Sequence, residues 1–179
     1  IGLLLYGVVA ATNYRRWMPF AVLAYGLSLA ALAVVLVAGT MRLGATRWLS
    51  VFGLSLQPSE FAKLATTCLL AQYLGGQPRP LPSRALAISL GLAAGPALLV
   101  FIQPDLGSAT VLGAIWLGMV WVAGASRRAI LGFGSVGLVC LPFAWHLLRD
   151  YQRDRLLAFL NPHADPLGTG YTVIQSTIA

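Results

Sequence analysis

Glu60 and Lys63 are a carboxylate and an ammonium group that could take part in catalysis. They stand three positions apart in the stretch QPSEFAK, at the start of an otherwise apolar run. On a helix this spacing places both side chains on one face, where a carboxylate and an ammonium group can pair. An ionisable pair in a membrane helix indicates a functional site that faces the bundle interior. A capped helix start with a local ion pair fits the same pattern, and both interpretations stay open.

A second stretch, QPDLGS at residues 103–108, repeats the Gln-Pro pair at another helix junction. We expect Pro104 and Asp105 to open a helix there, because a carboxylate is stabilised at the positive end of the helix dipole. We also expect the two junctions to face the same side of the protein.

The charged residues divide unequally when the apolar runs are threaded in order. One side receives only cations, which are Arg15, Arg16, Arg79, Arg84, Arg127 and Arg128. The other side receives Arg42, Arg47, Lys63, Arg149, Arg153 and Arg155, together with every acid of the chain, Glu60, Asp105, Asp150, Asp154 and Asp165. Cations could hold phosphate on the mixed side, and carboxylates could act as bases or bind a metal ion. Solvated loops with paired charges are the plainer alternative.

The composition indicates which kind of secondary structure carries these residues. The chain has 179 residues, of which 58% are hydrophobic and 9% charged, and its mean hydropathy is +0.79. Soluble domains carry about 25% charged residues, so this chain belongs in a bilayer. Several apolar runs exceed the roughly 18 residues that suggest a transmembrane helix. They cover residues 18–41, 85–104, 106–126 and 129–148.

We therefore predict an all-α polytopic transmembrane helix bundle that forms a single domain over residues 1–179. Its spans or part-spans are expected near 1–14, 18–40, 58–75, 84–102, 105–124 and 128–148. Residues 149–179 are expected to extend the last helix and to begin a large loop. Both ends of the sequence look cut, so we expect a fragment of a longer membrane protein.

The helix that carries Glu60 has to begin early to cross the bilayer. The uncharged run from Leu64 to Pro78 is too short at 1.5 Å per residue. We therefore predict that the helix begins near Pro58, a residue type that suits the first helical position. Glu60 then stands third in the helix, near the free backbone N–H groups.

The net charge of +7 does not indicate a nucleic-acid partner, because the basic residues stand in pairs between the spans without a run. Arginines at helix ends explain them better. The tight pairs favour the all-basic side as cytoplasmic, so the mixed side is expected outside. Cys68 and Cys140 lie inside apolar helices and are expected to be small buried residues. Their spacing is not that of metal ligands, and we assign no metal-binding residue.

Three stretches together resemble the SEDS family (shape, elongation, division and sporulation; RodA/FtsW-like), and its elongation branch most of all. They are GATRWLSVFGLSLQPSEFAKLA, QPDLGSATVL and YQRDRLLAFLNPHADPLGTGYTVIQSTIA. The resemblance implies ten transmembrane helices in the full protein, of which this chain would hold the end of the second through the seventh. It also implies an inverting peptidoglycan glycosyltransferase of the bacterial inner membrane that polymerises lipid II during cell elongation and shape maintenance. A class B penicillin-binding protein would be its partner, besides membrane lipid.

The resemblance indicates where the catalytic base lies, and the chemistry that it implies suggests roles for residues of this chain. The family's catalytic aspartate lies in a stretch resembling His-Thr-Asp-Phe, which this sequence lacks, and Asp165 of the DPLG motif is not that base. The chain by itself is therefore expected to be inactive. Glu60, Lys63 and Asp105 would support catalysis. The diphosphate and sugar would meet Arg42, Arg47, Lys63, Arg153 and Arg155, and a divalent cation could assist.

Two other functions remain open on the sequence alone. A transporter that flips lipid II would use glycine-rich helices such as GLAAG and GFGSVG, which permit close packing. A scaffold would dock and activate a penicillin-binding protein through the apolar positions at 156–160. The clustering of charge at one face favours the enzyme, because a transporter is expected to carry a polar site at the membrane midplane.

Overall fold

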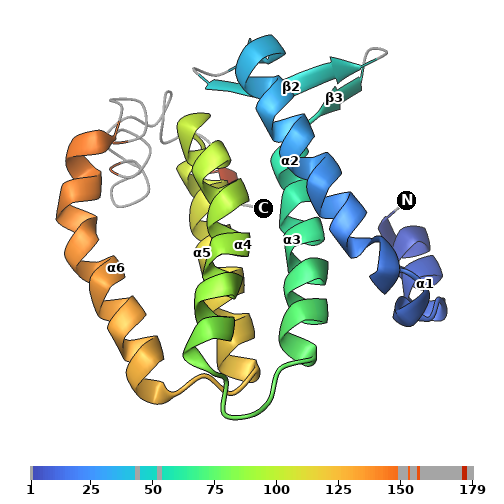
Figure 1. Ribbon diagram of the computed structural model, residues 1–179. Helices are drawn as coiled ribbons and strands as arrows, with labels where there is room; N and C mark the ends of the chain where they lie inside the picture. Colours follow the sequence, from blue (N-terminus) through green and yellow to red (C-terminus); the bar gives the residue numbers. More distant parts are fainter. Residues whose placement is uncertain are drawn as a thin grey trace. The chain divides into compact units, whose positions relative to one another are not determined.

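The computed structural model describes residues 2–42, 45–51 and 54–148, together with Arg153, Leu157, Gln175 and Ser176. Its helices are α1 Gly2–Ala11, η1 Tyr14–Arg16, η2 Met18–Phe20, α2 Ala21–Ala38, α3 Pro58–Gly75, α4 Ser83–Ile102, α5 Leu106–Val122 and α6 Arg127–Leu147 (Figure 1). The chain divides into two compact units, residues 1–130 and 131–179, and each is described by itself.

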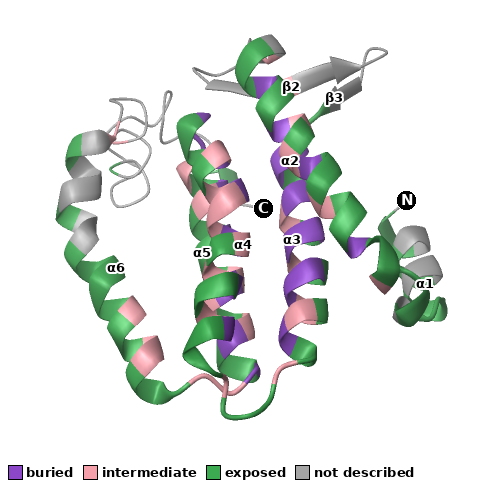
Figure 2. Cartoon of the chain, in the orientation of Figure 1, coloured by how far each residue is buried: buried purple, intermediate pink, exposed green. Residues whose placement is uncertain are grey.

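Long apolar sequences form the helices of the first unit. Two described helices are long and apolar enough to cross a membrane, at Met18–Val37 and Ser83–Ile102, and Leu106–Val122 is a shorter apolar helix. Large hydrophobic side chains are exposed on their outer faces, as Figure 2 shows in green; among them are Leu23, Leu27, Leu98 and Val122. An apolar exterior of this extent suits a lipid surrounding rather than water.

The start of α3 agrees with the sequence prediction. The helix begins at Pro58, directly after Gln57, whose backbone is extended. Proline is tolerated at this position because its missing N–H would have no helical partner. Glu60 consequently lies in the first turn of α3.

Helices α2, α3, α4 and α5 share one core. Helix α3 packs against α2, α4 and α5, and α4 packs against α5. The core cluster takes one fully buried residue from each helix, which are Leu32, Ala62, Val100 and Leu112. Ala62 follows Pro58 by one turn, and Val100 precedes Gln103 by about one turn. The core therefore supports the ends of the helices where the polar residues lie.

Side-chain hydrogen bonds connect α2 with α4, and α4 with α5. Tyr25 of α2 donates its hydroxyl to the Leu92 carbonyl of α4 at 2.8 Å. Trp116 of α5 donates its indole N–H to Ser89 Oγ of α4 at 3.0 Å. Gln103, only 1% exposed, donates Nε2 to the Leu32 carbonyl of α2 at 2.8 Å. These bonds fix the helices against one another more specifically than apolar packing does.

The connection between α2 and α3 is a small sheet, which the all-α prediction missed. Strands β1 Thr40–Arg42, β2 Ala45–Val51 and β3 Leu54–Leu56 form an antiparallel sheet in the order β1-β2-β3. The helix bundle is confirmed, and the sheet is added to it. Two residues separate each pair of strands, and the sequence has a glycine at 44 and at 53 within them. A short gap containing glycine is a hairpin signal, which could have revealed the sheet.

Helix α6 provides most of the described part of the second unit. It runs over Arg127–Leu147 with Pro142 inside it, close to the predicted range of 128–148. Arg153 donates Nη2 to the carbonyl of His146 at 3.4 Å. The predicted helix extension and loop at 149–179 lie almost wholly outside the described residues.

Candidate functional site

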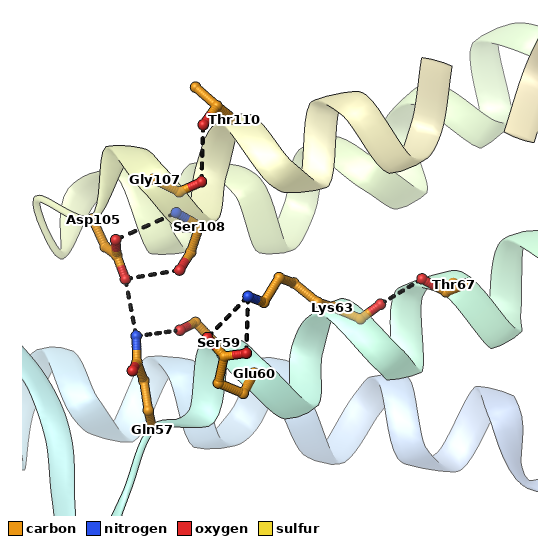
Figure 3. A network of polar contacts seen from close by, with 9 residues as sticks. All are labelled: Gln57, Ser59, Glu60, Lys63, Thr67, Asp105, Gly107, Ser108 and Thr110. Atoms are coloured by element: carbon orange, nitrogen blue, oxygen red, sulfur yellow. Dashed lines mark hydrogen bonds and ion pairs between the residues drawn. The ribbon is translucent and has the colours of Figure 1, made fainter. Parts of the chain in front are cut away.

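A polar join links the starts of α3 and α5 (Figure 3). We use this name for four residues, Gln57, Ser59, Asp105 and Ser108. Gln57 donates Nε2 to Asp105 Oδ2 at 3.1 Å and to Ser59 Oγ at 3.0 Å. The two Gln-Pro junctions therefore lie side by side. The sequence predicted that they face the same side, but not that they are in contact.

Asp105 bonds to the starts of both α5 and α3. It is the N-cap residue of α5, and its Oδ1 accepts the Ser108 backbone N–H at 3.3 Å. Its Oδ2 accepts the Ser108 hydroxyl at 2.9 Å as well as the Gln57 amide. Asp105 is only 5% exposed. A carboxylate this deeply buried needs such donors, because they replace the water that it has lost.

The Glu60–Lys63 ion pair lies on the first two turns of α3, next to the polar join (Figure 3). Lys63 Nζ contacts both carboxylate oxygens of Glu60 at 2.9 Å. The Lys63 side chain is 20% exposed and that of Glu60 is 57% exposed. Thr67 donates its hydroxyl to the Lys63 carbonyl at 2.7 Å. The ammonium group is thus partly sheltered while its partner reaches solvent, which leaves the pair accessible to a ligand.

The structure brings three of the candidate residues to one end of the first unit, Glu60, Lys63 and Asp105. Arg42 lies on β1 and Arg47 on β2, the sheet that leads into α3, but their side chains lie outside what the structure describes. Arg153 belongs to the second unit, and Arg155 lies outside the described residues. Among described residues, no three His, Cys, Asp or Glu side chains gather as metal ligands.

Sequence reasoning missed Gln57, Ser59 and Ser108 as members of the site. The repeated Gln-Pro pair was the available signal, but it did not distinguish the two glutamines. Gln103, its counterpart, bonds a carbonyl of α2 instead of the polar join. Only the packing of the helices decides which glutamine meets Asp105.

An apolar groove of about 550 Å³ runs between α2 and α3. On α3 it is lined by Pro58, Phe61, Leu64, Ala65 and Cys68, and on the facing segment by residues that include Trp17, Phe20, Ala24, Leu27 and Ala31. Its α3 positions begin at Pro58, within one turn of Glu60. Cys68 is a free, exposed thiol rather than the buried residue that the sequence predicted. The groove exposes it.

Long apolar helices, an apolar exterior, and the polar join with the Glu60–Lys63 pair at one end of the first unit define a membrane helix bundle. The chain belongs to the FtsW/RodA/SpoVE family, described as cell cycle proteins, whose family profile matches residues 1–179. This confirms the resemblance drawn from the three sequence stretches.

Curated relatives carry names that concern the cell wall or sporulation. The chain is 36% identical over 168 residues to peptidoglycan glycosyltransferase MrdB of Escherichia coli K12, covering 93% of this chain and 44% of the relative. It is 33% identical over 183 residues to stage V sporulation protein E of Bacillus subtilis, covering 100% and 50%. The chain thus spans about half the length of these relatives.

Solved structures agree with the family. A chain of a peptidoglycan synthase complex, studied for its coordination of polymerization and crosslinking, matches with a TM-score of 0.71 and 38% identity. The match covers 99% of this chain and 53% of that one. Thermus thermophilus rod shape determining protein RodA matches with a TM-score of 0.63 and 35% identity, covering 77% and 46%.

Proposed function

We propose that the whole protein is a peptidoglycan glycosyltransferase that polymerises lipid II during cell elongation and shape maintenance. The names of the relatives support the activity. The observation that carries the proposal is that the first turns of α3 carry both an ion pair and the beginning of an apolar groove. The Glu60–Lys63 pair lies on these turns, and Pro58 and Phe61 begin the α3 side of the groove, whose lining does not include the ion pair. Lipid II, a disaccharide-peptide on undecaprenyl diphosphate, has a charged head and a long apolar tail that match the ion pair and the groove.

The proposed reaction uses charge at the diphosphate. An aspartate expected elsewhere in the full protein removes the proton of an acceptor sugar hydroxyl. The oxygen attacks the anomeric carbon of the donor with inversion, and undecaprenyl diphosphate leaves. Negative charge grows on the leaving group, so a nearby cation lowers the barrier. We assign Lys63 to this role with Arg42 and Arg47, and Arg153 and Arg155 as further cations; a divalent cation could share the diphosphate with them.

Glu60 and Asp105 act in support of these cations. Glu60 holds the Lys63 ammonium in place at 2.9 Å. Asp105 orders the starts of α3 and α5 through its bonds to Gln57 and Ser108. Neither carboxylate is assigned as the general base. The apolar groove between α2 and α3 would accept part of a polyprenyl tail.

The proposed setting is the bacterial inner membrane, with residues 1–179 as one domain. Every helix that the sequence predicted to be a span would cross the bilayer. The starts of α3 and α5 would face outward. Arg79 and Arg84, at the opposite ends of α3 and α4, would face the cytoplasm. A class B penicillin-binding protein is the proposed partner, which the relative within a peptidoglycan synthase complex supports.

Polymerisation of labelled lipid II by the reconstituted full-length protein, with and without this partner, tests the proposal. We expect glycan ladders from the wild type and about 10²–10³-fold slower synthesis from Lys63→Ala, because a charge at the leaving group is lost. Arg84→Ala, at the opposite end of the helices, is the matched control and should retain activity.

Each other result has its own meaning. Glycan ladders unchanged by Lys63→Ala would still support a glycosyltransferase, but would show that the ion pair has a structural role only. A folded wild type that makes no ladders would reject the enzyme. Flipping of lipid II in liposomes would then indicate transport, and partner binding alone would indicate a scaffold.

A further inference from the structure

Gln57 connects two helices, although a residue at an N-cap position usually bonds only to the helix that it precedes. It stands at the N-cap of α3, yet its side chain makes no capping bond to its own helix. Side chains at this position commonly accept the free N–H groups of the helix that they precede. The amide of Gln57 instead reaches the carboxylate of Asp105, 48 positions later in the chain.

The surroundings make this bond a firm connection. Ser59, Asp105 and Ser108 are 2%, 5% and 8% exposed. Water has little access to replace the Gln57–Asp105 bond, and a bond to a carboxylate is stronger than one between neutral groups. Asp105 is itself fixed to the first turn of α5 by Ser108. The start of α3 is therefore anchored to a part of α5 that is already ordered.

The anchor lies close to the proposed reacting charges. Glu60 follows Gln57 by three residues and Lys63 follows Glu60 by three, all on the first turns of one helix. Any displacement of the first turn of α3 moves the ion pair with it. A misplacement of about 1 Å, even from a change far from the chemistry, can slow an enzyme about 10²-fold.

Building on the proposed function, we propose that Gln57 is a positioning residue for Lys63. It touches no substrate, and acts by holding the start of α3 against Asp105 so that the Lys63 ammonium meets the diphosphate of the leaving group. Charge at the leaving group grows in the transition state, so loss of the anchor should lower kcat more than it raises KM for lipid II.

An exchange of donor and acceptor tests this role in the full-length protein. Gln57→Glu sets a second carboxylate against Asp105, and two carboxylates at hydrogen-bond distance repel each other. Combining it with Asp105→Asn restores one amide and one carboxylate, now in exchanged positions. Asparagine also remains a good N-cap residue for α5. The double variant therefore rebuilds the anchor without rebuilding the wild-type residues.

We expect Gln57→Glu to lower kcat by between about tenfold and about 10²-fold, the latter being the effect of a 1 Å misplacement. The change in KM should be smaller. Adding Asp105→Asn should return kcat to within about threefold of Asp105→Asn alone, because the bond is restored. The melting temperature in detergent should follow the same pattern of loss and rescue. Gln72→Glu, the same change at an exposed position in the last turn of α3, is the matched control and should behave as the wild type.

The outcomes separate this inference from the proposed function. An active wild type with an equally active Gln57→Glu would overturn the positioning role alone. So would a loss of kcat that Asp105→Asn does not rescue while the melting temperature recovers. A folded wild type that makes no glycan would overturn the proposed function and the positioning role with it.

Discussion

The Tyr25 hydroxyl on α2 donates a hydrogen bond of 2.8 Å to the Leu92 carbonyl on α4. In an uninterrupted helix this carbonyl would accept the N–H of the residue four positions later, which here is Pro96 and has none. Tyr25 thus supplies the donor that the proline removes. Gly95 keeps the approach open, because a Cβ there would lie 3.1 Å from the tyrosine oxygen. The two helices are joined where the ladder of α4 is interrupted.

Tyr25→Phe should destabilise the protein by about 1 kcal/mol, because the carbonyl of Leu92 then has no donor. Thermal unfolding in detergent measures the change. Tyr6→Phe removes the same atom from a side chain that is 73% exposed and is the matched control. Equal melting temperatures for the two variants would show that the bond contributes nothing to stability.

Gly95→Ala should lower the melting temperature in the wild type and raise it in the Tyr25→Phe background. Alanine favours a helix over glycine by up to about 1 kcal/mol, which is the gain expected once the tyrosine oxygen is gone. With Tyr25 present, the added methyl group presses on that oxygen and opposes the gain. The same sign in both backgrounds would contradict the contact.

Asp105→Ala should cost about 2 kcal/mol or more. It removes the cap of α5, worth about 1 kcal/mol, and leaves the buried donors of Gln57 and Ser108 without their acceptor. Asp105→Asn should cost much less, because an amide still accepts and still caps. Unfolding in detergent compares them with Ser126→Ala, which removes an exposed bond to the Ala129 N–H at the start of α6. A loss for Asp105→Ala no greater than that for Ser126→Ala would contradict the double role of Asp105.

Cys68 should report lipid in the groove between α2 and α3. In a full-length protein with Cys68 as its single cysteine, a membrane-soluble thiol reagent should modify it, because the thiol is exposed and lines the groove. Undecaprenyl phosphate should slow the modification several-fold. A Val122→Cys variant without Cys68 offers a thiol on an exposed position of α5 and should be unaffected by the lipid. Equal protection at both positions would indicate a general membrane effect rather than occupation of the groove.

The sequence predicted the parts of the site that depend on local chemistry. Proline at the first helical position and a carboxylate in the first turn located the start of α3. Asp105 marked the start of α5 as its N-cap residue, but Pro104 lies outside that helix, which begins at Leu106. The ion pair followed from helical spacing alone. The partner of Asp105 could not be predicted in the same way, because Gln57 and Gln103 have the same local setting. Contacts between distant segments decide between them, and no local rule contains that information.

The sheet between α2 and α3, in contrast, had local sequence signals but was not predicted. Its signals were local, with glycines in both short gaps, but the strands are only three to seven residues long. They stand between long apolar runs that dominate the hydropathy of the chain. The sequence predicted only a connection between the two helices, whereas Arg42 and Arg47 belong to paired strands.

The sharing of Asp105 between α3 and α5 has a consequence for assembly in the membrane. Gln57 precedes its partner by 48 positions, so α3 and α4 are synthesised before the acceptor exists. Each helix can enter the bilayer by its own hydrophobicity, but the first turn of α3 acquires its final partner only after α5 has arrived. Insertion and completion of the site are thus separate events, and a nascent chain halted before Asp105 would carry Glu60 and Lys63 on a helix whose start is not yet fixed.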